Sequence, residues 1–255
     1  MTTLLPPFTS LRQRAASIAA RVLVAASLSG MGAWVGHYVA TNPDWRVEDV
    51  RFVGNSHADV PALRHLSDIR TGTHLAQVDL NRAIAGVERH PWVKHASARR
   101  VFPAAVEITV EEYTPVMLLA LDRLWYVDKD GVPFTPAKDG DLDLPVLTGL
   151  DPAFACREPD LARAVVTGGL RVLNSWTTHG GAVPADDASE VAFNAAHGYD
   201  LVLRSGTRLI LGFGDPADPL GKLDRLVAAG LDLKTPQRVD LDMETVAVAT
   251  PLPKL

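Results

Sequence analysis

One stretch decides the fold of the first half of the chain: residues 79–113, which read DLNRAIAGVERHPWVKHASARRVFPAAVEITVEEY. Asp79 can cap a helix whose apolar residues recur at the spacing of one helical face. They are Leu80, Ala83, Ile84 and Val87. Pro91 ends this helix, because the residue before a proline is pushed toward extended geometry. Strands are then predicted over residues 92–101 and 106–111, joined by a turn.

The residues before this stretch complete a small domain. Residues 47–53 alternate apolar and polar side chains and predict a strand. Asp59 can cap a helix that contains Pro61 in its first turn and Leu63 and Leu66 on its apolar face. The order strand, helix, helix, strand, strand predicts a three-stranded sheet with two helices on one face.

The residues after this stretch are richer in strands. Hairpins are predicted over residues 124–134, around Asp130-Gly131, and over residues 199–211. Two amphipathic helices are predicted, one over residues 161–176 and one following the apolar stripe from Leu220 to Leu231. The chain then ends in extended segments at 239–242 and 246–249, followed by prolines that cannot continue a ladder. The fold class expected for the whole chain is α+β.

A transmembrane helix is predicted over residues 22–40, which read VLVAASLSGMGAWVGHYVA. Arg12, Arg14 and Arg21 lie before this run, so the positive-inside rule places residues 1–21 in the cytoplasm and the rest of the chain outside. A cleaved secretory signal is the alternative, although its apolar run would be shorter.

Composition limits the kinds of partner. Hydrophobic residues make up 47% of the chain and charged residues 22%, which is typical of a globular protein. Beyond residue 43 lie 22 basic and 30 acidic residues, a net charge of −8, which argues against nucleic acid as a partner. Cys156 is the single cysteine, so an internal disulfide is excluded, and we expect it to be partly buried.

Two segments resemble the bacterial cell-division family FtsQ/DivIB. His90-Pro91-Trp92-Val93-Lys94, with the strands that follow it to Pro115, resembles the end of the family's POTRA domain. Residues 126–134 (YVDKDGVPF), with 144–149 (LPVLTG) and Val239-Asp240-Leu241, resemble its second, strand-rich domain. The resemblance implies a POTRA domain over 45–114, an FtsQ-type β domain over 115–251 and a tail over 252–255.

The resemblance also implies a function. Members are bitopic scaffolds of the divisome that bind the small coiled-coil proteins FtsB and FtsL and help control septal peptidoglycan synthesis. This implies a single-pass type II protein of the cell inner membrane, with its bulk in the periplasm at the division septum. In one family mode the partner adds a strand to the last strand of the second domain, as an open sheet edge permits. The candidate partner-binding residues are Val239, Leu241, Met243, Thr245, Val246, Ala247, Val248 and Ala249.

The chain departs from the family pattern at three places. Glu111-Glu112-Tyr113-Thr114-Pro115 lacks the arginine or histidine that often precedes the final proline of the first domain. Asp242 stands where arginine is usual, and Met243 where some members carry an aromatic residue. These departures concern the detailed partner surface rather than the architecture.

Signatures of catalysis and of metal binding are missing from these 255 residues. The histidines of the first domain form neither an HExxH nor a close His-x-His set. They are His57, His65, His74, His90 and His95. G-x-S-x-G is absent, Gly212-Phe213-Gly214-Asp215 predicts a turn after a strand, and Asp128 and Asp130 are interpreted as turn formers. We expect no enzymatic activity, cofactor or small-molecule substrate. The alternatives are a POTRA-containing envelope transport or assembly protein and a tethered envelope hydrolase.

Overall fold

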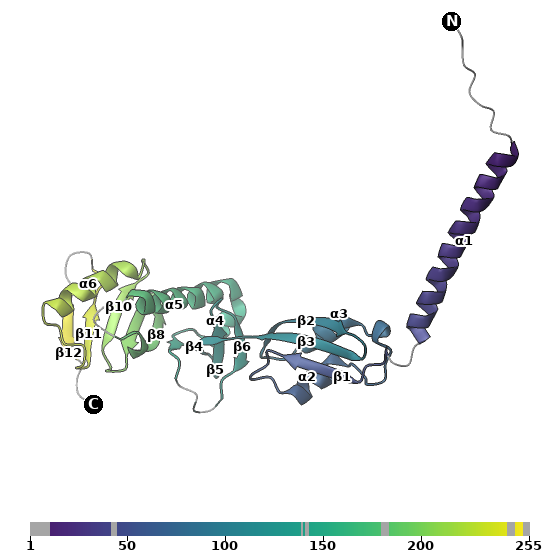
Figure 1. Cartoon of the computed structure of the whole chain (residues 1–255). Coiled ribbons are helices and arrows are strands. Elements are labelled where there is room, and N and C mark those ends of the chain that lie inside the picture. The colour runs from purple at the N-terminus through teal and green to yellow at the C-terminus, as the bar shows by residue number, and fades with distance from the viewer. Residues whose placement is uncertain are drawn as a thin grey trace, which may run out of the picture. The chain divides into compact units, whose positions relative to one another are not determined.

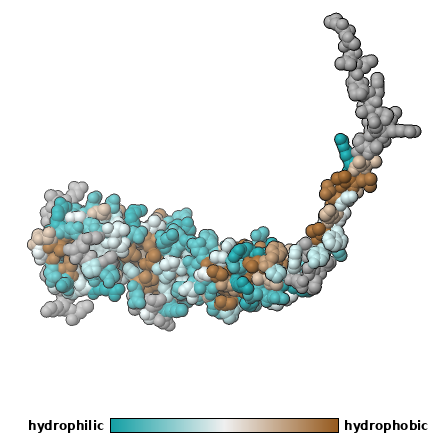
Figure 2. Space-filling view, in the orientation of Figure 1, coloured by the Kyte–Doolittle hydropathy of each residue, from teal (hydrophilic) through white to brown (hydrophobic). Residues whose placement is uncertain are grey.

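A computed structural model describes residues 11–41, 45–138, 140, 143–179, 184–243 and 248–251 (Figure 1). The first element is a long helix, α1 (Leu11–Thr41). Its segment Ile18–Tyr38 is apolar enough to cross a membrane and is wholly exposed, and Figure 2 shows hydrophobic residues along it. Near its end, the rings of Trp34 and Tyr38 stack with centroids 5.8 Å apart.

Beyond α1 the chain folds into two compact units, divided between Glu112 and Tyr113. The first unit contains a three-stranded sheet in the order β1-β3-β2, with β1 parallel and β2 antiparallel to β3. Its elements are β1 (Asp49–Val53), α2 (Val60–Ser67), the short 3-10 helix η2 (Leu75–Gln77), α3 (Leu80–Val87), β2 (Val93–Val101) and β3 (Ala105–Glu112). The predicted small sheet with two helices is confirmed.

The two helices of the first unit begin where their capping residues predict. The Asp59 carboxylate accepts a hydrogen bond from the Ala62 N–H, and the Asp79 carboxylate accepts one from the Arg82 N–H. The apolar faces of the helices pack with the sheet around a hydrophobic core. Its fully buried side chains include Val47, Leu63, Leu75, Val87, Val106 and Ile108.

The register of the sheet fixes where the chain enters and leaves the first unit. Asp49, at the start of β1, pairs with Ala105 at the start of β3, and Val53 pairs with Thr109. The chain therefore enters beside the turn that joins β2 and β3, and it leaves at Glu112, at the opposite end of the same sheet.

The second unit is built on a sheet of nine described strands in the order β12-β11-β10-β9-β8-β7-β4-β5-β6 (Figure 1). The strands are β4 (Pro115–Ala120), β5 (Leu124–Asp128), β6 (Pro133–Pro136), β7 (Val146–Thr148), β8 (Ala188–Asn194), β9 (Gly198–Leu203), β10 (Arg208–Gly212), β11 (Gln237–Asp240) and β12 (Val248–Pro251). The helices are α4 (Pro152–Arg157), α5 (Pro159–His179), α6 (Ala217–Ala228) and the 3-10 helix η3 (Ala185–Asp187). The α+β class is thereby confirmed.

Helix α5 lies close to the sheet because its glycines leave room for neighbouring side chains. A Cβ built on Gly168 would lie 2.0 Å from the Tyr199 hydroxyl oxygen, and one on Gly169 would lie 2.9 Å from Leu147 Cδ1. The Tyr199 hydroxyl donates a 3.0 Å hydrogen bond to the Val165 carbonyl of the same helix. The glycine pair, unusual inside a helix, is thus explained by packing.

The two predicted hairpins and both predicted helices of the second unit are present, but α6 ends at Ala228, before Leu231 of the predicted stripe. At the first hairpin, Asp128 is a turn former: its buried carboxylate accepts hydrogen bonds from the N–H groups of Asp130 and Val132. The expectation for Cys156 is wrong, because its position on the short helix α4 leaves it exposed.

Candidate functional site

The sheet of the second unit has two outer strands, β6 and β12. β6 has proline at two of its four positions, Pro133 and Pro136, and proline cannot donate a hydrogen bond to an added strand. β12 has a single proline, Pro251, at its last position. Of these two edges, β12 is therefore the better template for another strand.

β12 is held in place by β11, which lies between it and β10. β11 runs parallel to β10 and antiparallel to β12, and its Val239 and Asp240 pair with Ala249 and Val248. Because β11 has a strand on each side, its backbone is not open to a partner. Val239 is fully buried, as is Leu241 just after the strand. Val239 and Leu241 therefore belong to the core, and β12 rather than β11 is the outer strand of this part of the sheet.

The segment after β11 is fixed by backbone contacts. The Lys222 ammonium of α6 donates hydrogen bonds to the carbonyls of Leu241 and Met243, at 3.0 and 2.9 Å. The Leu241 N–H donates a 3.0 Å hydrogen bond to the Ile210 carbonyl of β10. α6 and β10 together therefore determine the direction in which the chain leaves β11.

Two of the three departures from the family pattern, Asp242 and Met243, lie in this segment. Asp242 lies against Gly212, which has a φ of +81° and whose Cβ, if present, would clash with the Asp242 carboxylate. Met243 is 54% exposed. An apolar side chain therefore lies at the surface just after β11.

The remaining predicted partner residues divide between two places. Val248 and Ala249 lie in β12, whereas Thr245, Val246 and Ala247 lie outside the described residues. A role in partner binding stays a prediction for all of them.

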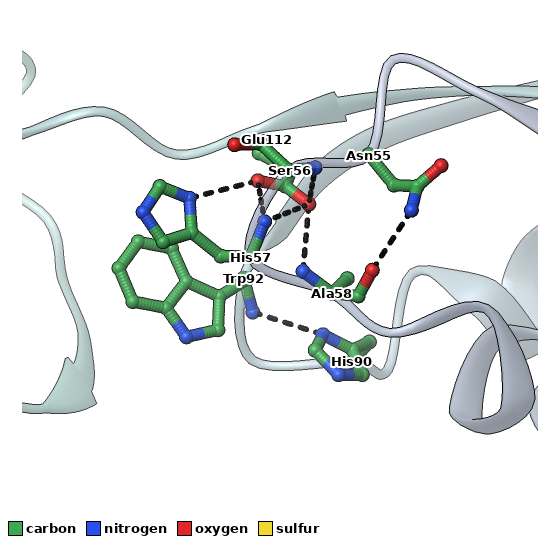
Figure 3. A network of polar contacts seen from close by, with 7 residues as sticks. All are labelled: Asn55, Ser56, His57, Ala58, His90, Trp92 and Glu112. Atoms are coloured by element: carbon green, nitrogen blue, oxygen red, sulfur yellow. Dashed lines mark hydrogen bonds and ion pairs between the residues drawn. The ribbon is translucent and has the colours of Figure 1, made fainter.

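A second polar site, which the sequence did not predict, surrounds Glu112 in the first unit (Figure 3). The Glu112 carboxylate accepts hydrogen bonds of 2.8 Å from the backbone N–H groups of Ser56, His57 and Ala58. The His57 imidazole lies 3.0 Å from the same carboxylate and stacks on the Trp92 ring at 4.0 Å. This network ties the loop before α2 to the last residue of β3.

The charge of Glu112 follows from these contacts. Burial alone would raise the pKa of its carboxyl group. The hydrogen bonds from the N–H groups of Ala58, His57 and Ser56, together with that from the His57 imidazole, outweigh burial and lower this pKa below its ordinary value. Glu112 is therefore a charged residue that holds the loop before α2 in place. The sequence could not predict this role, because the hydrogen-bond partners of Glu112 lie more than 50 positions away.

The histidines and the glycine-rich segment that were considered as metal or phosphate sites make contacts that support the fold. His90 accepts a hydrogen bond from the Trp92 N–H, and His74 from the Ala76 N–H. Within the described part of the chain, three or more metal-ligating side chains do not cluster at any point. Gly212 ends β10, as predicted for a turn after a strand.

Comparison with known proteins identifies both units. Residues 45–113 match the family model of the FtsQ-type POTRA domain, and residues 119–242 match that of the C-terminal part of the cell division protein FtsQ/DivIB. A Cell division protein FtsQ from Anaeromyxobacter sp. (strain K) is 35% identical over 219 residues, which cover 85% of this chain and 74% of that protein. The chain belongs to the FtsQ family of cell division proteins.

Other FtsQ proteins are similar over comparable lengths. The one from Myxococcus fulvus is 32% identical over 76% of this chain and 68% of its own length, and the one from Burkholderia pseudomallei is 31% identical over 85% and 82%. The second unit thus resembles the C-terminal part of FtsQ, which disfavours the alternative of an envelope transport or outer-membrane assembly protein.

Proposed function

We propose that this FtsQ-family chain is a non-enzymatic scaffold of the divisome that captures small coiled-coil proteins of the FtsB and FtsL type. Through this capture it helps control septal peptidoglycan synthesis. Helix α1 anchors it in the inner membrane as a single-pass type II protein, with residues 1–21 in the cytoplasm and the two folded units in the periplasm at the division septum.

One observation carries the proposed capture: β12 is an outer strand of its sheet, and its other side is not paired with any strand of the described chain. Main-chain groups on such an edge bind an added strand without needing a pocket. Only the last position of β12 is proline, so the outward-facing N–H groups among Val248, Ala249 and Thr250 can donate to an added strand.

The anchor and its direction are supported by α1 and by charge. The segment Ile18–Tyr38 is long and apolar enough to cross a bilayer, and Arg12, Arg14 and Arg21 precede most of it. The folded units carry the net negative charge, so a nucleic acid is not the proposed partner. The sequence also lacks a recognisable nucleophile motif, which favours binding over catalysis.

A paired proline scan tests the docking edge. Successive N–H groups of a strand point to opposite sides, so Ala249→Pro and Thr250→Pro remove one outward and one inward donor. The full chain is produced in membranes together with the FtsB- and FtsL-type proteins of the same bacterium, and their co-purification is measured. We expect the variant that loses the outward donor to lose capture while its thermal unfolding is little changed.

Thr135→Pro in β6 is the matched control, since it alters the opposite edge of the same sheet. It is expected to capture partners as well as the unaltered chain does. Capture that survives both β12 prolines would reject strand addition at this edge, and loss of capture in Thr135→Pro alone would move the docking site to β6.

A further inference from the structure

An exposed aromatic side chain lies at the turn between β2 and β3. Phe102 is 63% exposed, which makes it the most exposed large apolar residue described between Trp45 and Glu112. The Trp45 ring meets it edge-on, with centroids 5.4 Å apart and planes at 65°. Trp45 and Phe102 thus pack against each other and form one aromatic surface.

This aromatic pair lies where the chain arrives from α1. The Glu48 N–H donates a 2.8 Å hydrogen bond to the Ala104 carbonyl, so the first residues of the unit lie against the β2–β3 turn. Three residues separate Trp45 from Thr41, the last residue of α1. Even a fully extended chain keeps Trp45 within about 14 Å of that helix end.

We propose that Trp45 and Phe102 contact the headgroup region of the bilayer that α1 crosses. The inference rests on the proposed membrane anchoring of α1 and adds a second, non-covalent contact to it. Tryptophan favours the membrane–water interface, and phenylalanine is among the apolar residues that insert at the boundary between headgroups and acyl chains. Only three residues separate Thr41 from Trp45, and Phe102 is exposed at the same end of the unit. Phe102 is therefore within reach of lipid.

Aromatic contact rather than charge drives this association. The same end of the unit carries Arg46 and Arg100 but also Glu48 and Asp49, so its charges of opposite sign offset one another. The two guanidinium groups are also engaged, since Arg46 donates to the Gly72 carbonyl and Arg100 to the carbonyls of Leu75 and Val78. The β2–β3 turn is thereby held at the bilayer surface.

Fluorescent labels at the two ends of the sheet test the proposal. In a full-length Cys156→Ser chain, an environment-sensitive dye is attached to Glu48→Cys, beside the aromatic pair, or to Val53→Cys, at the opposite end of β1. The protein is reconstituted into phosphatidylcholine–phosphatidylglycerol vesicles that carry nitroxides on their headgroups. We expect stronger quenching at position 48 than at 53, and its loss when Phe102→Ser is added.

The outcomes separate this contact from the anchor. Quenching at position 48 that Phe102→Ser leaves unchanged would overturn the contact, even with the chain fully retained in alkali-washed vesicles, because the tether alone would then explain it. Equal quenching at both positions would also overturn it. A chain that alkali removes from the vesicles would instead reject the anchoring of α1, and the contact with it.

Discussion

Gly168 in α5 shows how a single missing Cβ sets the distance between a helix and a sheet. The Tyr199 hydroxyl occupies the space that a side chain would need, and burial raises the pKa of this hydroxyl. Gly221 in α6 offers the contrast, since a Cβ built there meets no atom within 4 Å. Glycine is required by packing at one helical position and not at the other.

We expect Gly168→Ala and Gly221→Ala to change stability in opposite directions. Overpacking against Tyr199 should lower the free energy of unfolding by about 1–3 kcal/mol. Gly221→Ala should raise it by up to about 1 kcal/mol, because alanine is the better helix former. Denaturant unfolding measures both, and a Gly168→Ala chain as stable as the unaltered one would contradict the close packing.

Glu112 is one residue through which the stability of the first unit should depend on pH. Its pKa is lower in the folded than in the unfolded chain, so its contribution is present above the unfolded pKa and is lost as pH falls through the folded pKa. Glu112→Gln should therefore cost about 2 kcal/mol at pH 7, through weakened charge-assisted hydrogen bonds.

Unfolding of the two proteins over a pH series checks this expectation. The difference between them should shrink below about pH 4.5, the ordinary range of a glutamate. Glu111→Gln is the control, because Glu111 is exposed and adjacent, and it should change stability by less than about 0.5 kcal/mol. A pH-independent difference for Glu112→Gln would show that its charge is unimportant.

The element α6 and the strand β10 hold the segment that follows β11, the neighbour of the proposed docking strand β12. Lys222 holds the carbonyls of Leu241 and Met243, and β10 holds the N–H of Leu241. The edge strand β12 then pairs with β11, whose position these contacts fix. Partner capture should therefore respond to changes in α6 that leave β12 itself unaltered.

Lys222→Met should loosen this segment. We expect faster amide hydrogen exchange over residues 237–243 and weaker capture of FtsB- and FtsL-type proteins, because two hydrogen bonds to the backbone are lost. Arg225→Met, at an exposed position of the same helix, should change neither measurement. Unchanged exchange in Lys222→Met would show that the lysine does not hold the segment.

Local sequence signals predict some of these elements and miss others. Asp59 and Asp79 predicted helix starts, and Pro91 a helix end, because capping and proline geometry act within a few residues. The strand β7 was not predicted, because three residues are too few to show an alternating pattern. Its partners β4 and β8 are also distant in sequence. Sequence could not distinguish the outer strand β12 from its inner neighbour β11 for a similar reason, since only the sheet order separates them.

Helix α1 is either retained as a membrane anchor or cleaved from the rest of the chain as a signal sequence. The fully exposed apolar surface of Ile18–Tyr38 fits a retained membrane helix. The alternative is a secretory signal that is cleaved from the chain. The two folded units each have their own hydrophobic core. They should therefore stay folded when the helix is removed.

Alkaline extraction of cell membranes distinguishes the two cases. We expect the chain to stay with the lipid at full length, and a variant lacking residues 18–38 to be released into the aqueous fraction. Protease added outside spheroplasts should digest the folded units of the full-length protein. Recovery of a soluble form that lacks the residues up to the end of α1 would support cleavage of a signal sequence.

The arrangement of strands in the first unit determines how it would carry a mechanical load. Tension along the chain would pull β1 from its first residue and β3 from its last, and these two strands are parallel neighbours. Their interstrand hydrogen bonds would then be loaded together in shear instead of being opened one after another. The first unit should therefore resist stretching through this ladder if it carries tension between the proposed membrane anchor and the second unit.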